Sequence, residues 1–66
     1  MDEYISKIIA EFNKHATRAD ELAANPQIGN LHEEGYHAFM ANAISNAVLK
    51  SSNDELKRRF NLEAIS

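Results

Sequence analysis

The chain lacks cysteine and tryptophan altogether, and it has one proline and two glycines among its 66 residues. Without cysteine it can form neither a disulfide nor a thiolate nucleophile. Two glycines are too few for the loops that cradle phosphate groups, and none of the serines lies in a glycine-rich nucleophile elbow. We therefore expect a protein that has no cofactor and is not an enzyme.

Long apolar runs are missing as well. The sequence contains no stretch of about 18 consecutive apolar residues, the length that a membrane-spanning helix needs. Asp2 and Glu3 stand where a secretory signal would carry basic residues. These absences predict a cytoplasmic protein without membrane partners.

Bulky apolar side chains are also scarce. Hydrophobic residues make up 44% of the chain, or 29 residues, but 10 of these are alanine, which leaves 19 larger side chains. A compact fold of this mass exposes roughly 4,200 Å² and buries only about 60% of the surface of the unfolded chain. The entropy lost on folding, about 1.5 kcal/mol per residue, offsets nearly all of the hydrophobic gain. We therefore expect one domain, residues 1–66, that gains stability by associating with a second chain.

Apolar residues in the first third of the chain recur at the heptad spacing of a packed helix. They are Ile5, Ile9, Phe12, Ala16, Ala19 and Ala23. This pattern predicts a helix over about residues 2–24, with Asp2 as its N-cap. Pro26 disfavours helical backbone in the residue before it, so the helix should end by Asn25.

Two further helices are predicted after this break. The second covers about residues 31–50, and Asn30 and Glu33 before and within it have the spacing of a capping box. A short third helix, over about residues 53–60, follows Ser52, which has the same spacing to Glu55. The residues predicted to share one broad apolar face of the second helix are Tyr36, Phe39, Met40, Ala43, Ile44, Ala47 and Val48.

The two long helices are predicted to pack as an antiparallel hairpin, which makes the fold class all-α with a short C-terminal helix. If the chain reverses near Ile28, Ala16 faces Phe39 and Ala19 faces Tyr36, so that a large side chain meets a small one. A lone hairpin leaves part of its apolar stripe uncovered, which favours a homodimeric four-helix bundle, or else a groove in a partner protein. The residues assigned to self-association are Ile5, Ile8, Ile9, Ile44, Val48 and Leu49.

The segment from His32 to His37 is the densest group of potential metal ligands. Its two histidines are five residues apart, whereas the zinc motif H-E-x-x-H needs them four apart on one helix face. Glu34 and His37 match the E-x-x-H spacing of di-iron bundles, and Glu11 is a conceivable further carboxylate. Because both glutamates fall outside the predicted apolar faces, we interpret them as solvated and predict no metal site. His15, beside the apolar seam of the first helix, is interpreted as a packing residue.

Two charged groups offer alternative functional surfaces. Lys57, Arg58 and Arg59 precede Phe60, a combination found in nucleic-acid contacts, although flanking acidic residues leave the local charge near zero. A nucleic-acid-associated regulator is therefore the alternative to a protein-binding module. At the predicted turn, four carboxylates could steer a basic partner. They are Asp20, Glu21, Glu33 and Glu34.

The start Met1-Asp2-Glu3-Tyr4-Ile5 leads directly into the first predicted helix. With its small size and helical, intracellular composition, the chain resembles the short accessory proteins encoded in the early regions of temperate lambda-like bacteriophages. This resemblance implies a small helical protein that binds a host or phage protein during phage development and has no catalytic residues. The prediction for the whole chain is a self-associating interaction module that regulates a protein of unknown identity.

Overall fold

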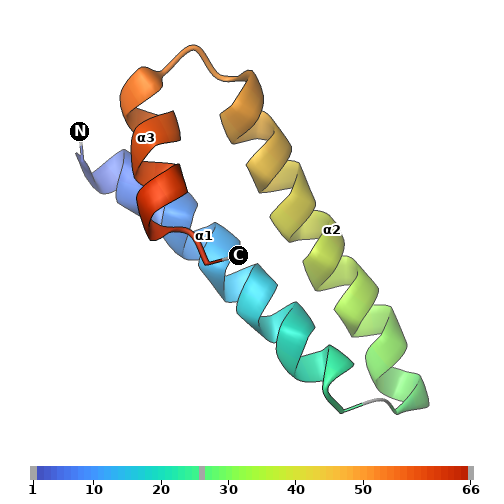
Figure 1. Cartoon of the computed structure of the whole chain (residues 1–66). Coiled ribbons are helices and arrows are strands. Elements are labelled where there is room, and N and C mark those ends of the chain that lie inside the picture. The colour runs from blue at the N-terminus through green and yellow to red at the C-terminus, as the bar shows by residue number, and fades with distance from the viewer. Residues whose placement is uncertain (1, 26, 66) are drawn as a thin grey trace.

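The chain folds into a rod of helices in the computed structural model of Figure 1. The structure describes residues 2–25 and 27–65, with the side chains of residues 3–25, 27 and 31–65. Within these ranges the chain is all-helical and has no strand, which confirms the predicted class. Its extents of 40 × 17 × 16 Å make the rod elongated. Its accessible surface of 4800 Å² consequently exceeds the roughly 4,200 Å² of a compact protein of this mass.

Three helices form the described part of the chain: α1 spans Asp2–Ala23, α2 spans Ile28–Lys50 and α3 spans Asp54–Glu63. α1 and α2 run antiparallel and pack along their length as the predicted hairpin. α3 turns back after the end of α2 and lies beside the first half of α1 (Figure 1). The hairpin thus has one end covered by α3 and one end formed by the turn.

The predicted end of α1 is confirmed to within one residue. The backbone amide of Ala24 donates to the carbonyl of Asp20 at 3.0 Å, and that of Asn25 donates to the carbonyl of Leu22 at 3.2 Å. This tightening of the last turn satisfies carbonyl groups that a helix end leaves open. The sequence predicts that Pro26 ends this helix and that the side chain of Asp2 caps its start. Both Pro26 and the side chain of Asp2 lie outside the described residues.

The capping box predicted for α2 is wrong. α2 begins at Ile28, directly after Gln27 in an extended conformation, and its cap residue makes no side-chain hydrogen bond. Asn30 and Glu33 therefore lie inside the helix rather than at its start. Exposed amide groups in a first turn can be hydrated, so this end of the hairpin does not require a side-chain cap.

The cap predicted for α3 is displaced by one residue. Asn53, not Ser52, is the N-cap, and its Oδ1 accepts a hydrogen bond from the backbone amide of Leu56 at 3.1 Å. The Oγ of Ser51 in turn accepts from the backbone amide of Asn53 at 3.0 Å. α3 also continues to Glu63, three residues beyond the predicted end at residue 60.

The main apolar cluster lies at the end of the hairpin that α3 covers. Ile5 and Ile9 of α1 pack with Val48 of α2 and Leu56 of α3, each of them 3–6% exposed. Phe60 extends this cluster, and its ring meets that of Phe12 edge-on at 4.8 Å between centroids; Ile8 and Ile44 pack against the same cluster. α3 therefore buries side chains that a bare hairpin would leave exposed.

The face predicted for α2 is wrong in its aromatic part. Tyr36 and Phe39 remain 56% and 69% exposed, so neither lies between the helices opposite an alanine of α1. Among the side chains of α2 that the structure describes, Ala41 and Val48 are the buried ones instead. α2 carries apolar side chains around most of its circumference, so helical periodicity alone does not select the face that meets α1.

Candidate interaction surface

An apolar groove runs between α1 and α2. Its floor is formed by half-buried Ile8, Met40 and Ile44, and Tyr4, 64% exposed, stands at its side. This part of the groove has a volume of about 380 Å³. It continues past the same Tyr4, Ile8 and Ile44 into a second hollow of about 310 Å³, which ends at the connection between α2 and α3. The remaining residues that line this hollow are Ala47, Val48, Ser51 and Leu56. Together these two hollows form what we call the apolar groove.

A row of exposed apolar side chains on α2 follows the border of the apolar groove. Tyr36, Phe39, Ala43 and Ala47 are all exposed, and their spacing of three or four residues places them on one side of the helix. Ala47 also lines the groove, so the row and the groove adjoin. We call this row the apolar ridge. A concave and a convex apolar surface therefore lie next to each other.

The structure divides the six residues that sequence analysis assigned to self-association. Ile5, Ile9 and Val48 are buried within the single chain, where Leu56 packs against them. Ile8 and Ile44 line the apolar groove. The sixth, Leu49, is 67% exposed, but it follows Ala47 by two residues and so lies about 200° away around α2.

Two charged residues, Lys7 and Glu11, line the apolar groove from α1. They are four residues apart and therefore on one side of the helix. The carboxylate of Glu11 makes a 3.1 Å ion pair with Lys14, in which both side chains are more than half exposed. The rim of the groove thus carries a positive group, Lys7, and one helical turn further along a negative group, Glu11.

His15 and His37 form a polar contact between α1 and α2. His15 is only 7% exposed, and its Nδ1 lies 2.8 Å from the Nδ1 of His37. Glu11 places a carboxylate oxygen 4.0 Å from the other ring nitrogen, Nε2, of His15. The Tyr36 ring stands edge-on to both imidazoles, with centroids 6.2 Å from His15 and 5.0 Å from His37. His15 also lines the apolar groove.

Sequence analysis did not find this pair. It treated His15 as a packing residue and compared His37 with Glu34, its neighbour on the same helix. The pairing depends on the register between α1 and α2, and the size-matching register placed other residues opposite each other. Among the described residues, no group of three or more histidine, cysteine, aspartate or glutamate side chains could hold a metal ion.

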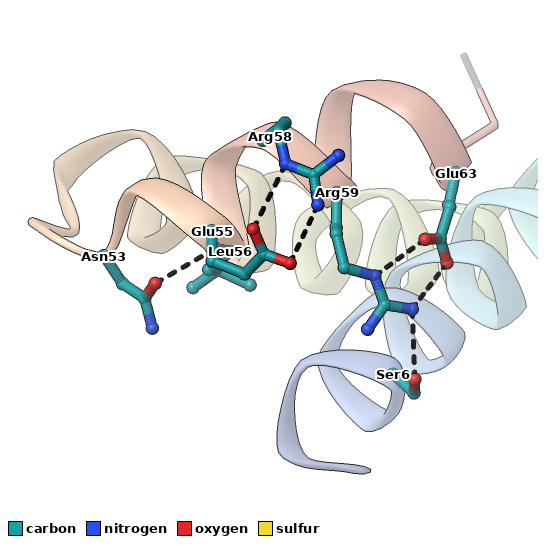
Figure 2. Close-up of polar contacts among 7 residues, drawn as sticks. All are labelled: Ser6, Asn53, Glu55, Leu56, Arg58, Arg59 and Glu63. Atoms are coloured by element: carbon teal, nitrogen blue, oxygen red, sulfur yellow. Dashed lines mark hydrogen bonds and ion pairs between the residues drawn. The ribbon is translucent and has the colours of Figure 1, made fainter. Parts of the chain in front are cut away.

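The basic cluster of α3 is engaged in ion pairs (Figure 2). Arg58 binds both carboxylate oxygens of Glu55, at 3.1 and 2.8 Å, and Arg59 binds both oxygens of Glu63, at 2.7 and 3.0 Å. Arg59 also donates to the Oγ of Ser6 on α1 at 3.2 Å. Two of the three predicted phosphate contacts thus have carboxylate partners, and one of them links α3 to α1.

These ion pairs shift the ionisation of the carboxylates. The hydrogen bond from Arg58 is the main cause that lowers the pKa of Glu55, and the hydrogen bond from Arg59 does the same for the pKa of Glu63. The same contact with Glu55 raises the pKa of Arg58. The pair of Arg58 with Glu55 is at least half exposed and is expected to contribute little to stability, whereas the Arg59 side chain is only 18% exposed in its pair with Glu63.

A second polar contact fixes the end of α3 on α1. The side-chain amide of Asn13 donates to the backbone carbonyl of Glu63 at 3.2 Å. Its Oδ1 accepts from the backbone amide of Ile65 at 2.8 Å. Asn13 therefore satisfies a donor and an acceptor at the helix end, where backbone groups lack partners within the helix.

The four carboxylates predicted to form an acidic end lie at the turn end of the hairpin. Asp20 and Glu21 are exposed near the end of α1, and Glu21 accepts from Arg18 at 3.4 Å. On α2, Glu33 is exposed and Glu34 is half-buried. The antiparallel hairpin brings these two segments to the same end of the rod.

A scan against protein-family models and searches of curated proteins and of solved structures find no match to this chain. Within the described residues, no helix has the length and apolar character needed to cross a membrane.

Proposed function

We propose that this chain is a non-enzymatic helical interaction module that pairs with a second copy of itself through the apolar groove and the apolar ridge. The observation that carries the proposal is the adjacency of these two surfaces on one hairpin. In a two-fold dimer each surface is used twice, because the ridge of each chain enters the groove of the other. Two hairpins packed in this way form a four-helix bundle.

The charges on the rim support an antiparallel arrangement of the two α1 helices. Lys7 and Glu11 have opposite charge and lie one turn apart along the groove. A two-fold axis between them brings Lys7 of each chain opposite Glu11 of the other. Such complementary rims favour one register and disfavour the parallel arrangement, in which like charges meet.

The accessible surface area of the chain also supports a second copy as the binding partner. The accessible surface of 4800 Å² exceeds that of a compact protein of this mass by about 600 Å². A standard interface buries about 800 Å² on each partner, which is of the same order. A second copy would therefore cover much of the apolar surface that this small chain leaves exposed.

The dimer we propose acts in the cytoplasm as a regulatory module on a further protein, in keeping with the resemblance to phage accessory proteins. The turn end, with Asp20, Glu21 and Glu33 exposed, lies outside the groove and stays accessible in the dimer. Its negative charge favours a partner with a basic surface.

Sedimentation equilibrium of the wild type and of two matched variants tests the pairing. Phe39→Glu introduces a charge on the apolar ridge, and Leu49→Glu introduces the same charge at a position of α2 that is as exposed but lies off the ridge, 69% against 67%. We expect the wild type and Leu49→Glu to form dimers, and Phe39→Glu to dimerise at least about tenfold more weakly, equivalent to about 1.4 kcal/mol. Circular dichroism should show equal helix content, since neither position is buried in the chain. A wild type that stays monomeric at high micromolar concentration would overturn the proposal, and a dimer weakened only by Leu49→Glu would place the interface elsewhere.

A further inference from the structure

The contact between His15 and His37 depends on the number of protons it holds. At 2.8 Å between the two Nδ1 atoms, one nitrogen must carry the hydrogen and the other must offer its lone pair. A neutral imidazole has one donor and one acceptor nitrogen, so two neutral rings can meet this condition. The contact joins α1 to α2 in the part of the hairpin that lies between the α3-covered end and the turn.

The charged groups around the pair come from both helices that pack there. On α1, Glu11 faces Nε2 of His15 at 4.0 Å and is shared with Lys14, while Lys7 lies further along the groove. Near His37, the outer surface of α1 contributes Lys14 and the ion pair of Arg18 with Glu21. On α2, the carboxylates of Glu33 and Glu34 lie one turn before His37 on the same side of the helix, and the neighbouring titratable ring is that of Tyr36. These surroundings hold both signs of charge, and Glu11 is the group aligned with a ring nitrogen of the pair.

We infer that the His15–His37 pair is a proton-operated lock, which holds the hairpin while it carries up to one extra proton and opens when it takes a second. The first extra proton can bind an outward Nε2, and that of His15 faces Glu11. The Nδ1–H to Nδ1 hydrogen bond then persists as a charge-assisted bond. The second proton must take the remaining Nδ1 lone pair. Two N–H donors then face each other, and two positive charges meet at a site where His15 is almost fully buried.

The direction of the pH effect follows from the protons bound in each state. Histidine is the side chain that ordinarily changes charge between about pH 5 and 8. In the unfolded chain both imidazoles take an extra proton over this range, whereas the folded pair accepts the second one only by losing its hydrogen bond. The unfolded chain therefore binds more protons, and stability falls as the pH falls. A difference of one proton changes the unfolding equilibrium by up to about tenfold per pH unit.

The lock also regulates the surface proposed for dimerisation, and this step rests on the proposed function. His15 forms part of the groove wall beside Met40, so a second proton on the pair displaces a residue that lines the binding surface. Dimerisation should therefore weaken in the same pH range as the stability of the hairpin. The lock and the dimer are nevertheless separate properties, because the histidine pair lies within one chain.

Urea unfolding of the untagged protein at pH 7.5, 6.5 and 5.5 tests the lock. The decisive variant is His37→Gln, since the amide oxygen of glutamine can accept from Nδ1–H of His15 whether or not His15 is charged. The control is His32→Gln, which removes the one other histidine of the chain, an exposed residue. We expect the unfolding equilibrium constant of the wild type and of His32→Gln to rise by about tenfold between pH 7.5 and 5.5, and that of His37→Gln to change much less. Equal pH dependence in all three proteins would overturn the inference.

A second measurement covers the case in which His37→Gln does not fold cooperatively. In an NMR titration of the wild type, the signals of His15 and His37 should report two coupled steps of proton uptake. Two identical, uncoupled curves for these two residues would overturn the lock. Repeating the urea series at two protein concentrations separates the two proposals: a midpoint independent of concentration counts against the dimer alone, and a midpoint independent of pH counts against the lock alone.

Discussion

The end of the hairpin that α3 covers packs Ile5, Ile9 and Val48 against Leu56, whereas the part nearer the turn buries alanines, one leucine and a histidine. At the covered end, bulky residues from three helices fill one cluster. Towards the turn, Ala19 and Ala41 are buried, and a polar contact between two imidazoles joins the helices. α1 and α2 are thus held together by bulky apolar side chains at the covered end, and by small side chains and a polar contact nearer the turn.

This difference shows how a chain with few bulky residues distributes them. α3 adds Leu56 and Phe60 where α1 and α2 already present isoleucine and valine, and so it completes a core at one end. Nearer the turn, small side chains allow the helices to approach without such a filling layer. The covered end should therefore be the stable part of the molecule, and the turn end should be the part that responds to solution conditions.

Removal of the α3 side chain in the main cluster should have the largest effect. Leu56→Ala leaves a cavity among Ile5, Ile9 and Val48, and substitutions of this kind cost about 2–5 kcal/mol. For a chain of this size that is a large share of the total stability, so we expect a much lower urea midpoint and loss of the ring contact between Phe12 and Phe60.

Leu62→Ala is the matched control for this prediction, because Leu62 lies on the same helix but is 71% exposed. It should change the urea midpoint little. Hydrogen exchange of the Leu56→Ala variant adds a local reading, since amide protection should fall first in α3 and the adjoining part of α1. Equal losses of stability in the two variants would contradict the idea that α3 completes the core.

The cap of α3 should have an intermediate effect. Asn53→Ala removes the acceptor for the backbone amide of Leu56 and should cost about 1 kcal/mol. Ser52→Ala is the control, because Ser52 is the cap expected from the sequence and Asn53 is the cap in the structure. In thermal unfolding, the Tm of Asn53→Ala should be clearly lower than that of Ser52→Ala. The reverse order would restore the cap that the sequence predicts.

A hollow near the turn should allow a small gain in stability. About 220 Å³ of space lies beside Ala16, Ala38 and Ala41, and Ile65, which follows α3, also lines it. Ala38→Met should partly fill it and raise stability by about 0.5 kcal/mol. The same change at exposed Ala10 should have no such effect on the urea midpoint. A loss of stability at position 38 would mean that the helices already pack too closely there.

The sequence predicts the elements of this fold better than their pairing. The heptad spacing predicted for α1 is confirmed at Ile5, Ile9 and Ala19, which are buried, but not at Ala23, which is exposed. In α2, by contrast, Tyr36, Phe39 and Ala41 all satisfy a helical pattern, and only the packing with α1 and α3 decides which one is buried. The candidate interaction surface could not be predicted for the same reason, since it consists of the apolar side chains that this packing leaves exposed.

The histidine pair shows a related limit. Its two residues are 22 positions apart and belong to different helices, so no local spacing connects them. A register of one helix against the other is needed to bring them together, and size matching alone chose a register in which Phe39 would be buried. Polar pairs between helices are thus visible only after the apolar packing is known.

The smallest expected effect concerns the ion pair between Arg59 and Glu63 within α3, whose arginine also donates to Ser6 of α1. The hydrogen bond from Arg59 lowers the pKa of Glu63 below its ordinary 4.5, so the contribution of this pair is present above that value and is lost as the pH falls through the lowered one. Because the pair joins two residues of α3 and its loss leaves the contacts between α1 and α2 intact, this loss should loosen α3 without unfolding the hairpin. We expect the amide protection factors of α3, which correct for the intrinsic pH dependence of exchange, to fall below about pH 4.5 in the wild type, with a shallower dependence in Glu63→Gln. Glu21→Gln, which removes an exposed pair within α1 alone, should behave like the wild type. The contact between His15 and His37, nearer the turn, and the carboxylate of Glu63 at the covered end would then respond to pH in different ranges. An identical pH profile for α3 in Glu63→Gln and wild type would remove that distinction.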